Sequence, residues 1–377
     1  MTHLRNPAVK LPTVDELRKI SDELGLKCTE EELLFAQEHY KGASASYQKV
    51  FDMVEETPPV KYPRLPGHRE KSDPACRGLV DMALGSDQGG SIRMPSSWCG
   101  IVGLKPTFGL VPYTGSVSLE STVDHLGPMT RTVDDCALLL EAIAGYDDGL
   151  DPRQHRDLKV PKYSKLLNKS IKGTKIAVLK EGFENVDDDV CRVVKATISK
   201  LQAEGAIFED VSIPKHNDGV GYGWKGFYPT SLAEKLASSV KSRPFEIPFP
   251  LKISLMFGDY IERNYQKKFY CKAQNLRRVL CKAYDDVLEH HDVIVMPTTS
   301  GKPLKLPTTE LSLSEIIDLS YGLGKNMSSF NITGHPAISV NVGFTDGLPC
   351  GMMIVGKMFD DLTVLQVAKT VENVVKK

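Results

Sequence analysis

The chain has 377 residues, of which 41% are hydrophobic and 25% charged, so it is long and apolar enough to bury a large globular core. Its 47 basic and 48 acidic side chains give a formal net charge of −1, which argues against a nucleic-acid surface or a basic membrane-binding face. No apolar stretch has the length of a signal peptide or a membrane span, and the eight cysteines form no CxxC pair. We therefore expect a cytoplasmic protein with reduced thiols and no metal site.

The first part of the chain, residues 1–60, is predicted to be helical. Thr13 has a glutamate three residues later, which is the spacing of a capping box, and the same spacing recurs at Thr29. An apolar face with helical period follows each of these residues. Residues 61–77 are rich in proline and charge and show no apolar period, so we predict a linker or the junction left by a deletion.

The remainder, residues 78–377, is predicted to form one domain that begins with alternating strands and helices. LVDMALG (79–85) predicts a buried strand that leads into a glycine loop, and a capped helix is predicted over 132–145. KIAVLK, the amphipathic segment DVCRVVKATISKLQAEG and AIFEDVSIP then follow in strand–helix–strand order. This order is typical of a βαβ unit and favours a largely parallel sheet covered by helices.

Three later apolar runs, DVIVMPTT, PAISVNVGF and GMMIVG, also predict buried strands, and an amphipathic helix begins near Leu362. The region at about 217–291 is less regular, with helical patterns at 231–242 and 260–289. It either covers the sheet or forms a substrate pocket, and the pattern favours neither interpretation.

A glycine-rich loop with a serine, GSDQGGSIRMPSS (85–97), follows the first predicted strand. Acyl transfer by a serine needs a base for its proton and fixed donors for the oxyanion. Gly89 and Gly90 tolerate positive φ and allow successive backbone N–H groups to converge beside Ser91. A plain turn explains the two glycines equally well, and the loop lacks the patterns of a phosphate-binding loop and of an α/β-hydrolase elbow.

GLVDMALGSDQGGSIRMPSSWCGIVGLKPTFGLVP (78–112) resembles the signature of the amidase signature family. The resemblance continues through DHLGPMTRTVDDCALLLEAIAG (124–145), KIAVLK, VIVMPTT and FNITGHPAISVNVGFTDGLPCGMMIVG (330–356), in the order of the family. It implies an α/β fold with a mixed, mainly parallel sheet between helix layers. It also implies hydrolysis of a carboxamide to a carboxylic acid and ammonia, or transfer of ammonia released from glutamine. The implied partner is a small-molecule amide, with no cofactor, no nucleic acid and no membrane, and a homodimer is left open.

The resemblance assigns roles to single residues. Ser91 corresponds to the nucleophile that carries the acyl group. Four backbone N–H groups correspond to the oxyanion hole, namely those of Gln88, Gly89, Gly90 and Ser91. Asp87 and Arg93 correspond to supports of the loop, and Phe330 and Asn331 to positions that line the pocket.

The other two catalytic groups of the family, a lysine in a Lys-Asp motif and a serine in a cis peptide bond, have no matching motif upstream of the signature. Where the glycine–serine loop is expected, the chain reads LPGHREKSDPACR (65–77), in which only Lys71 and Ser72 have suitable side chains. We interpret this as the loss of an internal block between about residues 66 and 77, which would remove early strands and expose a sheet edge. Loss of the activating partners would lower kcat by about 10⁴ to 10⁶.

Histidine is the remaining candidate base. His125 and His335 lie inside matching motifs, where a hydrogen-bonded structural histidine is favoured, and His290 and His291 lie at a predicted helix end. Three functions therefore remain open: an active amidase, a catalytically impaired relative such as a shortened isoform or pseudoenzyme, and an ammonia-supplying amidotransferase subunit.

Overall fold

The computed structural model describes residues 10–52, 81–116, 118–147, 149–216, 244–304, 311–321 and 324–376. These residues belong to two compact units, and α9 (Lys268–His290) begins in the first unit and continues in the second from Arg277. Residues 66–77, with Lys71 and Ser72, lie outside the described residues, as does the helical pattern at 231–242.

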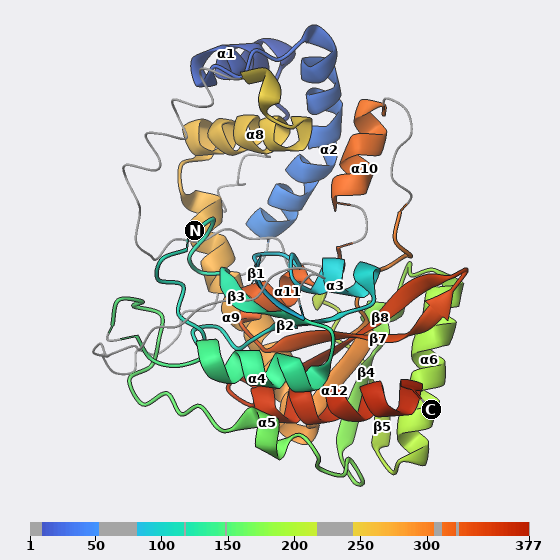
Figure 1. Cartoon of the computed structure of the whole chain (residues 1–377). Helices are drawn as coiled ribbons and strands as arrows, with labels where there is room; N and C mark the ends of the chain where they lie inside the picture. The colour runs from blue at the N-terminus through green and yellow to red at the C-terminus, as the bar shows by residue number, and fades with distance from the viewer. Residues whose placement is uncertain are drawn as a thin grey trace, which may run out of the picture. The chain divides into compact units, whose positions relative to one another are not determined.

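The described residues of the first unit are helical (Figure 1) and form, besides the start of α9, the helices α1 (Val14–Leu24), α2 (Glu30–Asp52), α8 (Phe249–Tyr265) and α10 (Leu313–Tyr321). The predicted capping boxes are confirmed, because the hydroxyls of Thr13 and Thr29 each accept the backbone N–H three residues on, both at 3.2 Å. Tyr40 lies in its apolar core and donates its hydroxyl to the Ile253 carbonyl at 2.5 Å. This unit includes α8 and α10, which lie within the range expected to form one domain over 78–377, and that domain boundary stays a prediction.

The second unit contains a mixed eight-stranded sheet between helix layers, as the sequence predicts (Figure 1). Its strands are β1 (Met82–Asp87), β2 (Val102–Lys105), β3 (His125–Thr130), β4 (Lys175–Leu179), β5 (Ile207–Val211), β6 (Val293–Pro297), β7 (Ala337–Thr345) and β8 (Leu348–Gly356). They lie in the order β1-β3-β2-β7-β8-β6-β4-β5.

The expectation of a mainly parallel sheet needs correction. Among the described strands, β4 pairs in parallel with β5 and β6, and the other pairings are antiparallel. The βαβ prediction is confirmed, since α6 (Asp188–Ala203) connects the parallel strands β4 and β5. Of the antiparallel pairs, β7 and β8 are joined by a tight turn between Thr345 and Leu348.

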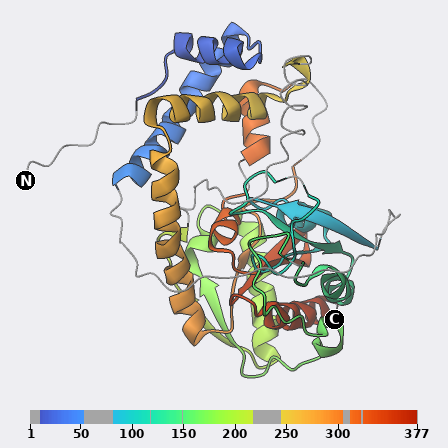
Figure 2. The ribbon, with the colours of Figure 1, turned by 90° about the vertical axis from the view of Figure 1, so that its left-hand side faces the viewer.

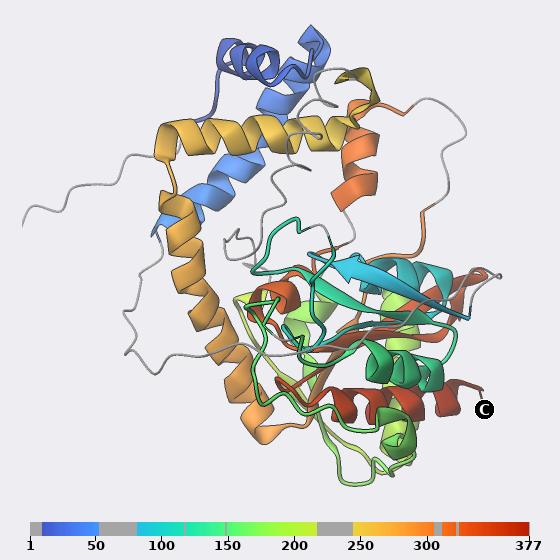
Figure 3. The ribbon, with the colours of Figure 1, turned by 60° about the vertical axis from the view of Figure 1, so that its left-hand side comes forward.

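Each face of the sheet has its own helix layer. One face packs on α4 (Val133–Ile143), α5 (Tyr163–Leu166), α6 and α12 (Asp361–Lys376), and the other on α3 (Arg93–Cys99), α11 (Ser328–Thr333) and the second half of α9. Figures 2 and 3 show these layers from the side, with α4 and α12 together on one face. Successive residues of β4 follow this division, since Ile176 belongs to the first core and Ala177 to the second.

The strand that precedes the serine loop is not buried, contrary to the prediction from LVDMALG. β1 is the end strand of the sheet and pairs, within the described part of the chain, with β3 alone. Leu84 in its middle is 52% exposed. Apolar composition indicates a strand but does not say whether another strand covers it.

The helical pattern at 260–289 forms parts of two helices, because Gln266 between α8 and α9 adopts φ 53°. Over the ranges that the structure describes, no helix combines the length and the hydropathy that crossing a membrane requires.

Candidate functional site

The loop that joins β1 to α3 carries Ser91 and requires glycine at one position. Gly90 has φ +132°, which side chains rarely adopt, and a Cβ built there would lie 2.7 Å from the Met327 sulfur. The loop therefore passes so close to Met327, the residue before α11, that any larger residue would force the Met327 side chain to shift. Gly89 is less constrained, because its nearest neighbour, the Ser328 hydroxyl, would be 3.8 Å from a Cβ.

A fully buried carboxylate fixes the shape of this loop. Asp87 ends β1, and its Oδ1 accepts the Gly90 N–H at 2.7 Å while its Oδ2 accepts the Ile92 N–H at 3.2 Å. Arg93 pairs with the same carboxylate, with Nε 3.0 Å from Oδ2 and Nη2 3.0 Å from Oδ1. Both side chains are 0% exposed. Such a bidentate, charge-assisted pair holds its geometry more rigidly than a surface ion pair.

Asn331 on α11 connects this ion pair to the neighbouring helix. Its amide nitrogen donates to the backbone carbonyl and to Oδ1 of Asp87, both at 2.8 Å, and its carbonyl accepts Arg93 Nη2 at 2.6 Å. Arg93 Nη1 donates to the Met327 carbonyl at 3.0 Å. We call Asp87, Arg93 and Asn331 the loop clamp, because together they join β1, α3 and α11.

The two residues expected to line the pocket are fully buried. Asn331 is a member of the loop clamp, and Phe330 packs in the core, with its ring centroid 5.0 Å from that of Tyr284 and 5.9 Å from that of His216. Their role toward a substrate stays a prediction.

The charges around the loop clamp have strongly shifted pKa values. Burial alone would raise the pKa of Asp87, but the Arg93 guanidinium and the hydrogen bonds from Arg93 and Asn331 outweigh burial and hold this pKa well below its ordinary range. Burial, with the Arg93 charge, lowers the pKa of the fully buried Lys105 far below that of a free lysine. Burial, with the Lys105 charge, likewise lowers the pKa of His125. The loop is therefore held by a carboxylate, that of Asp87, which stays ionised at neutral pH.

Ser91 itself is exposed at the surface of the loop. Among the described residues, its hydroxyl and its backbone N–H have no hydrogen-bond partner, and the same holds for the Gly89 N–H. The Gly90 N–H, by contrast, is engaged by Asp87. Of the donors expected to form an oxyanion hole, those of Gly89 and Ser91 are thus free to meet a ligand in this part of the structure, and that of Gly90 is not.

The histidines considered as bases have other partners. His125 donates Nδ1–H to the Val123 carbonyl at 2.7 Å, while its Nε2 is buried without a partner among the described atoms. His335 bonds through both ring nitrogens, to the Thr333 hydroxyl at 2.9 Å and to Asp285 at 3.1 Å.

His291 contacts the Val287 carbonyl at 2.9 Å and Glu209 at 3.1 Å. Within the described ranges, none of these histidines contacts Ser91. The described residues also hold no cluster of three or more His, Cys, Asp or Glu side chains that could bind a metal ion.

One neighbour of the loop, Tyr113, was not predicted from the sequence. The Gln88 side chain donates Nε2–H to the Tyr113 hydroxyl at 2.8 Å. Tyr113 stands in the PYTG segment directly after the signature, but nothing local in the sequence connects it to Gln88.

Comparison with known proteins matches the same part of the chain that carries the serine loop and the loop clamp. The family model described as Amidase matches residues 75–365, which includes the serine loop and all three residues of the loop clamp. The chain belongs to the amidase family. An enantioselective amidase of Rhodococcus rhodochrous is 39% identical to this amidase-family chain over 317 residues, covering 77% of the chain and 60% of the relative. A glutamyl-tRNA(Gln) amidotransferase subunit of Geobacillus kaustophilus is 38% identical over 341 residues, covering 82% of the chain and 67% of the relative.

Solved structures show the same fold. The corresponding glutamyl-tRNA(Gln) amidotransferase subunit of Thermotoga maritima is 31% identical with a TM-score of 0.60, over 78% of this chain and 63% of that one. A bacterial aryl acylamidase of the amidase signature family is 26% identical with a TM-score of 0.61, over 79% of this chain and 63% of that one. The amidase-family chain thus spans less than two thirds of the length of these structures.

Proposed function

We propose that the chain is an amidase that hydrolyses a carboxamide to a carboxylic acid and ammonia through an acyl-enzyme on Ser91. The observation that carries this proposal is the exposed Ser91 hydroxyl on a loop whose course is fixed by a fully buried clamp. A weak nucleophile gains most from a fixed position beside preorganised donors. Family membership and the similarity to an enantioselective amidase support the same reaction class.

In this mechanism the Ser91 oxygen attacks the amide carbonyl carbon and gives up its proton to a base. The N–H groups of Gly89 and Ser91 stabilise the oxyanion, with Gln88 at the start of the same loop as a further proposed donor. The C–N bond then breaks, the amide nitrogen takes up a proton and leaves as ammonia, and water hydrolyses the acyl ester. The clamp residues Asp87 and Arg93 hold the loop and take no proton.

A second candidate function is that of a catalytically impaired relative that keeps the serine loop without its base. The sequence lacks the family's Lys-Asp and cis-serine motifs, and we propose that an internal block upstream of the signature has been lost. The exposed edge strand β1, with Leu84 52% exposed, supports this proposal. Lys71 and Ser72 are the candidate replacements for the lost base.

A third candidate is a protein that supplies ammonia within a complex, as the similarity to the glutamyl-tRNA(Gln) amidotransferase subunits suggests. It predicts co-purification with a partner protein, whereas the amidase proposal needs only a small-molecule amide. Cytoplasmic location and a homodimer stay predictions in all three cases.

Ammonia release separates the first two candidates. Purified protein is incubated with a panel of aliphatic and aromatic amides, beside the variants Ser91→Ala and Ser199→Ala. Ser199 is a suitable control because it is exposed on α6 and its hydroxyl, among the described residues, donates to the Lys195 carbonyl alone. Turnover that is lost in Ser91→Ala and kept in Ser199→Ala supports the amidase. No turnover from a folded, monodisperse sample contradicts it and favours the impaired relative.

A further inference from the structure

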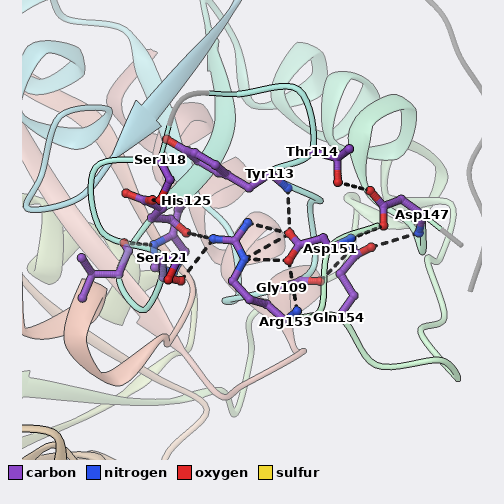
Figure 4. A network of polar contacts seen from close by, with 12 residues as sticks. Gly109, Tyr113, Thr114, Ser118, Ser121, His125, Asp147, Asp151, Arg153 and Gln154 are labelled. Carbon is purple, nitrogen blue, oxygen red and sulfur yellow. Dashed lines mark hydrogen bonds and ion pairs between the residues drawn. The ribbon is translucent and has the colours of Figure 1, made fainter. Parts of the chain in front are cut away.

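A second buried polar cluster lies in the loop that follows α4, and it shares no residue with the loop clamp. We call it the brace, and it consists of Asp147, Asp151, Arg153 and Gln154 (Figure 4). Nothing in the mechanism above uses these residues. Their side chains nevertheless carry two negative charges and one positive charge inside the protein, where polar groups persist only when they are well bonded.

Arg153 is the centre of the brace. Its guanidinium lies 2.6 Å (Nη2) and 2.8 Å (Nε) from the two oxygens of Asp151, and the two side chains are 8% and 3% exposed. Its Nη1 donates to the carbonyls of Ser121 at 3.3 Å and Asp124 at 3.2 Å. Figure 4 shows the guanidinium between Asp151 on one side and the Ser121 segment on the other. One side chain therefore connects the chain before β3 with the loop that follows α4.

Asp147 and Gln154 fix the loop that presents this arginine. Asp147 Oδ1 accepts the Asp151 N–H at 2.9 Å, and Gln154 accepts the Asp147 N–H at 3.0 Å. Gln154 also donates to the carbonyls of Gly109 at 3.0 Å and Gly145 at 2.6 Å. These hydrogen bonds fix the backbone of the loop that carries Arg153, independently of the contacts that its guanidinium makes.

The brace positions Tyr113. Asp151 Oδ2 accepts the Tyr113 N–H at 2.8 Å, and the Arg153 guanidinium lies 4.9 Å from the centre of the Tyr113 ring, within the range of a cation–π contact. The tyrosine is 6% exposed, and burial raises the pKa of its hydroxyl to about 12. The phenol therefore stays neutral at physiological pH, and its oxygen accepts the Gln88 amide at 2.8 Å.

We propose that Tyr113 is a positioning residue for the Ser91 loop, with its hydroxyl holding the Gln88 side chain and the brace holding Tyr113. Gln88 precedes Gly89, so restraining its side chain restrains the peptide that carries the free Gly89 N–H. The loop then has two supports: the loop clamp below Gly90, and Tyr113 at Gln88. The expected effect of Tyr113 on catalysis rests on the proposed amidase function. Its expected effect on the order of the Ser91 loop does not.

The test uses Tyr113→Phe, which removes only the hydroxyl and keeps the ring under Arg153 and the N–H that Asp151 binds. Tyr40→Phe is the matched control, since it removes a buried tyrosine hydroxyl bonded to Ile253 in the first unit. Amide hydrogen exchange is followed by mass spectrometry on the peptide covering 85–94, in which the N–H groups of Gly90 and Ile92 are bonded to Asp87.

We expect exchange in this peptide to become about fivefold faster in Tyr113→Phe, the factor that the loss of one neutral hydrogen bond gives, and to stay unchanged in Tyr40→Phe. Gln88→Met removes the donor at similar length and should also raise exchange, by no more than Tyr113→Phe does, because the Tyr113 hydroxyl keeps its contact with Ser86. The double variant Gln88→Met/Tyr113→Phe should fall clearly short of the sum of the single variants, because both changes remove the Gln88–Tyr113 bond, although Tyr113→Phe also removes the contact of the hydroxyl with Ser86. Unchanged exchange in Tyr113→Phe, or full additivity in the double variant, would overturn the inference.

Exchange needs no turnover, so this result stands whether or not ammonia is released. Where ammonia release is measurable, Tyr113→Phe should lower kcat about tenfold at constant KM, because the residue acts on donors that serve the transition state. A rise in KM at constant kcat would instead assign Tyr113 to substrate binding and overturn the positioning role.

Discussion

Removal of the Arg93 guanidinium by Arg93→Met tests the loop clamp most severely. The side chain is 0% exposed and makes four hydrogen bonds to oxygen acceptors: Nε and Nη2 bind Asp87, Nη2 binds Asn331, and Nη1 binds Met327. Methionine fills part of the same volume but leaves the Asp87 carboxylate buried without its cation. Breaking a buried ion pair by removing one partner costs about 3–5 kcal/mol, and the stranded Met327 carbonyl adds to this cost.

We therefore expect Arg93→Met to lower the free energy of unfolding by about 4 kcal/mol, a large share of the roughly 5–15 kcal/mol typical of a protein. Urea unfolding followed by tryptophan fluorescence measures this loss, and Trp98 on α3 reports from the same helix. Arg131→Met is the control, because the Arg131–Asp81 pair is 67% and 73% exposed and its loss should leave the urea midpoint nearly unchanged.

The ion pair itself is isolated by a cycle with Asp87→Asn. The double variant Asp87→Asn/Arg93→Met should lose at least about 2 kcal/mol less than the sum of the single variants, because the second change no longer strands a charge. Additive losses, or a loss in Arg93→Met no larger than that in Arg131→Met, would refute the reasoning.

Two further perturbations probe the loop and the buried charges. Gly90→Ala should lower the free energy of unfolding in urea by about 2 kcal/mol or more, because it combines a φ of +132° with a 2.7 Å approach to the Met327 sulfur. The control Gly173→Ala, with φ +82° and nothing within 4 Å of the added Cβ, should lower it by about 1 kcal/mol. Equal losses in the two variants would contradict the close contact at Gly90. Asp361 is fully buried and burial raises its pKa from 3.8 to about 6, so its stabilising contribution is fully present below about pH 4 and is lost as the pH rises through 6. The stability of the wild type relative to Asp361→Asn should therefore fall by about 3 kcal/mol as the pH is raised from about 4 to well above 6, and a pH-independent difference in thermal or urea unfolding would contradict the raised pKa.

Local sequence signals predicted local structure well. The capping boxes, α4, α6 and the parallel pair β4–β5 were predictable because each depends on residues near to one another in the chain. The antiparallel hairpin β7–β8 had a signal that was not used: Asp346 and Gly347 form a two-residue turn with φ 51° and 74°, as Asp-Gly hairpin turns do. The exposure of β1 had no signal, because it depends on which strands lie beside it.

The residues of the site also divide into those with a local sequence signal and those that depend on distant parts of the chain. Asp87, Gly90 and Arg93 lie within one short segment, so the resemblance in that segment was enough to predict a supported loop. Their partners lie far away in sequence: Asn331 binds Asp87 across 244 positions, and Tyr113 binds Gln88 across 25. Such contacts depend on the packing of α11 and of the segment after β2, which no local pattern encodes.

The central claim, that Ser91 is a nucleophile on a preorganised loop, is tested most directly by covalent labelling. Folded protein is incubated with an alkyl fluorophosphonate, which modifies a serine only when its oxygen attacks phosphorus and fluoride leaves. Intact-mass and peptide mass spectrometry then locate the adduct. The account predicts one added phosphonyl group, on the peptide that contains Ser91, and none in Ser91→Ala. Folded wild-type protein that stays unlabelled, or a label of equal extent in Ser91→Ala, would contradict it.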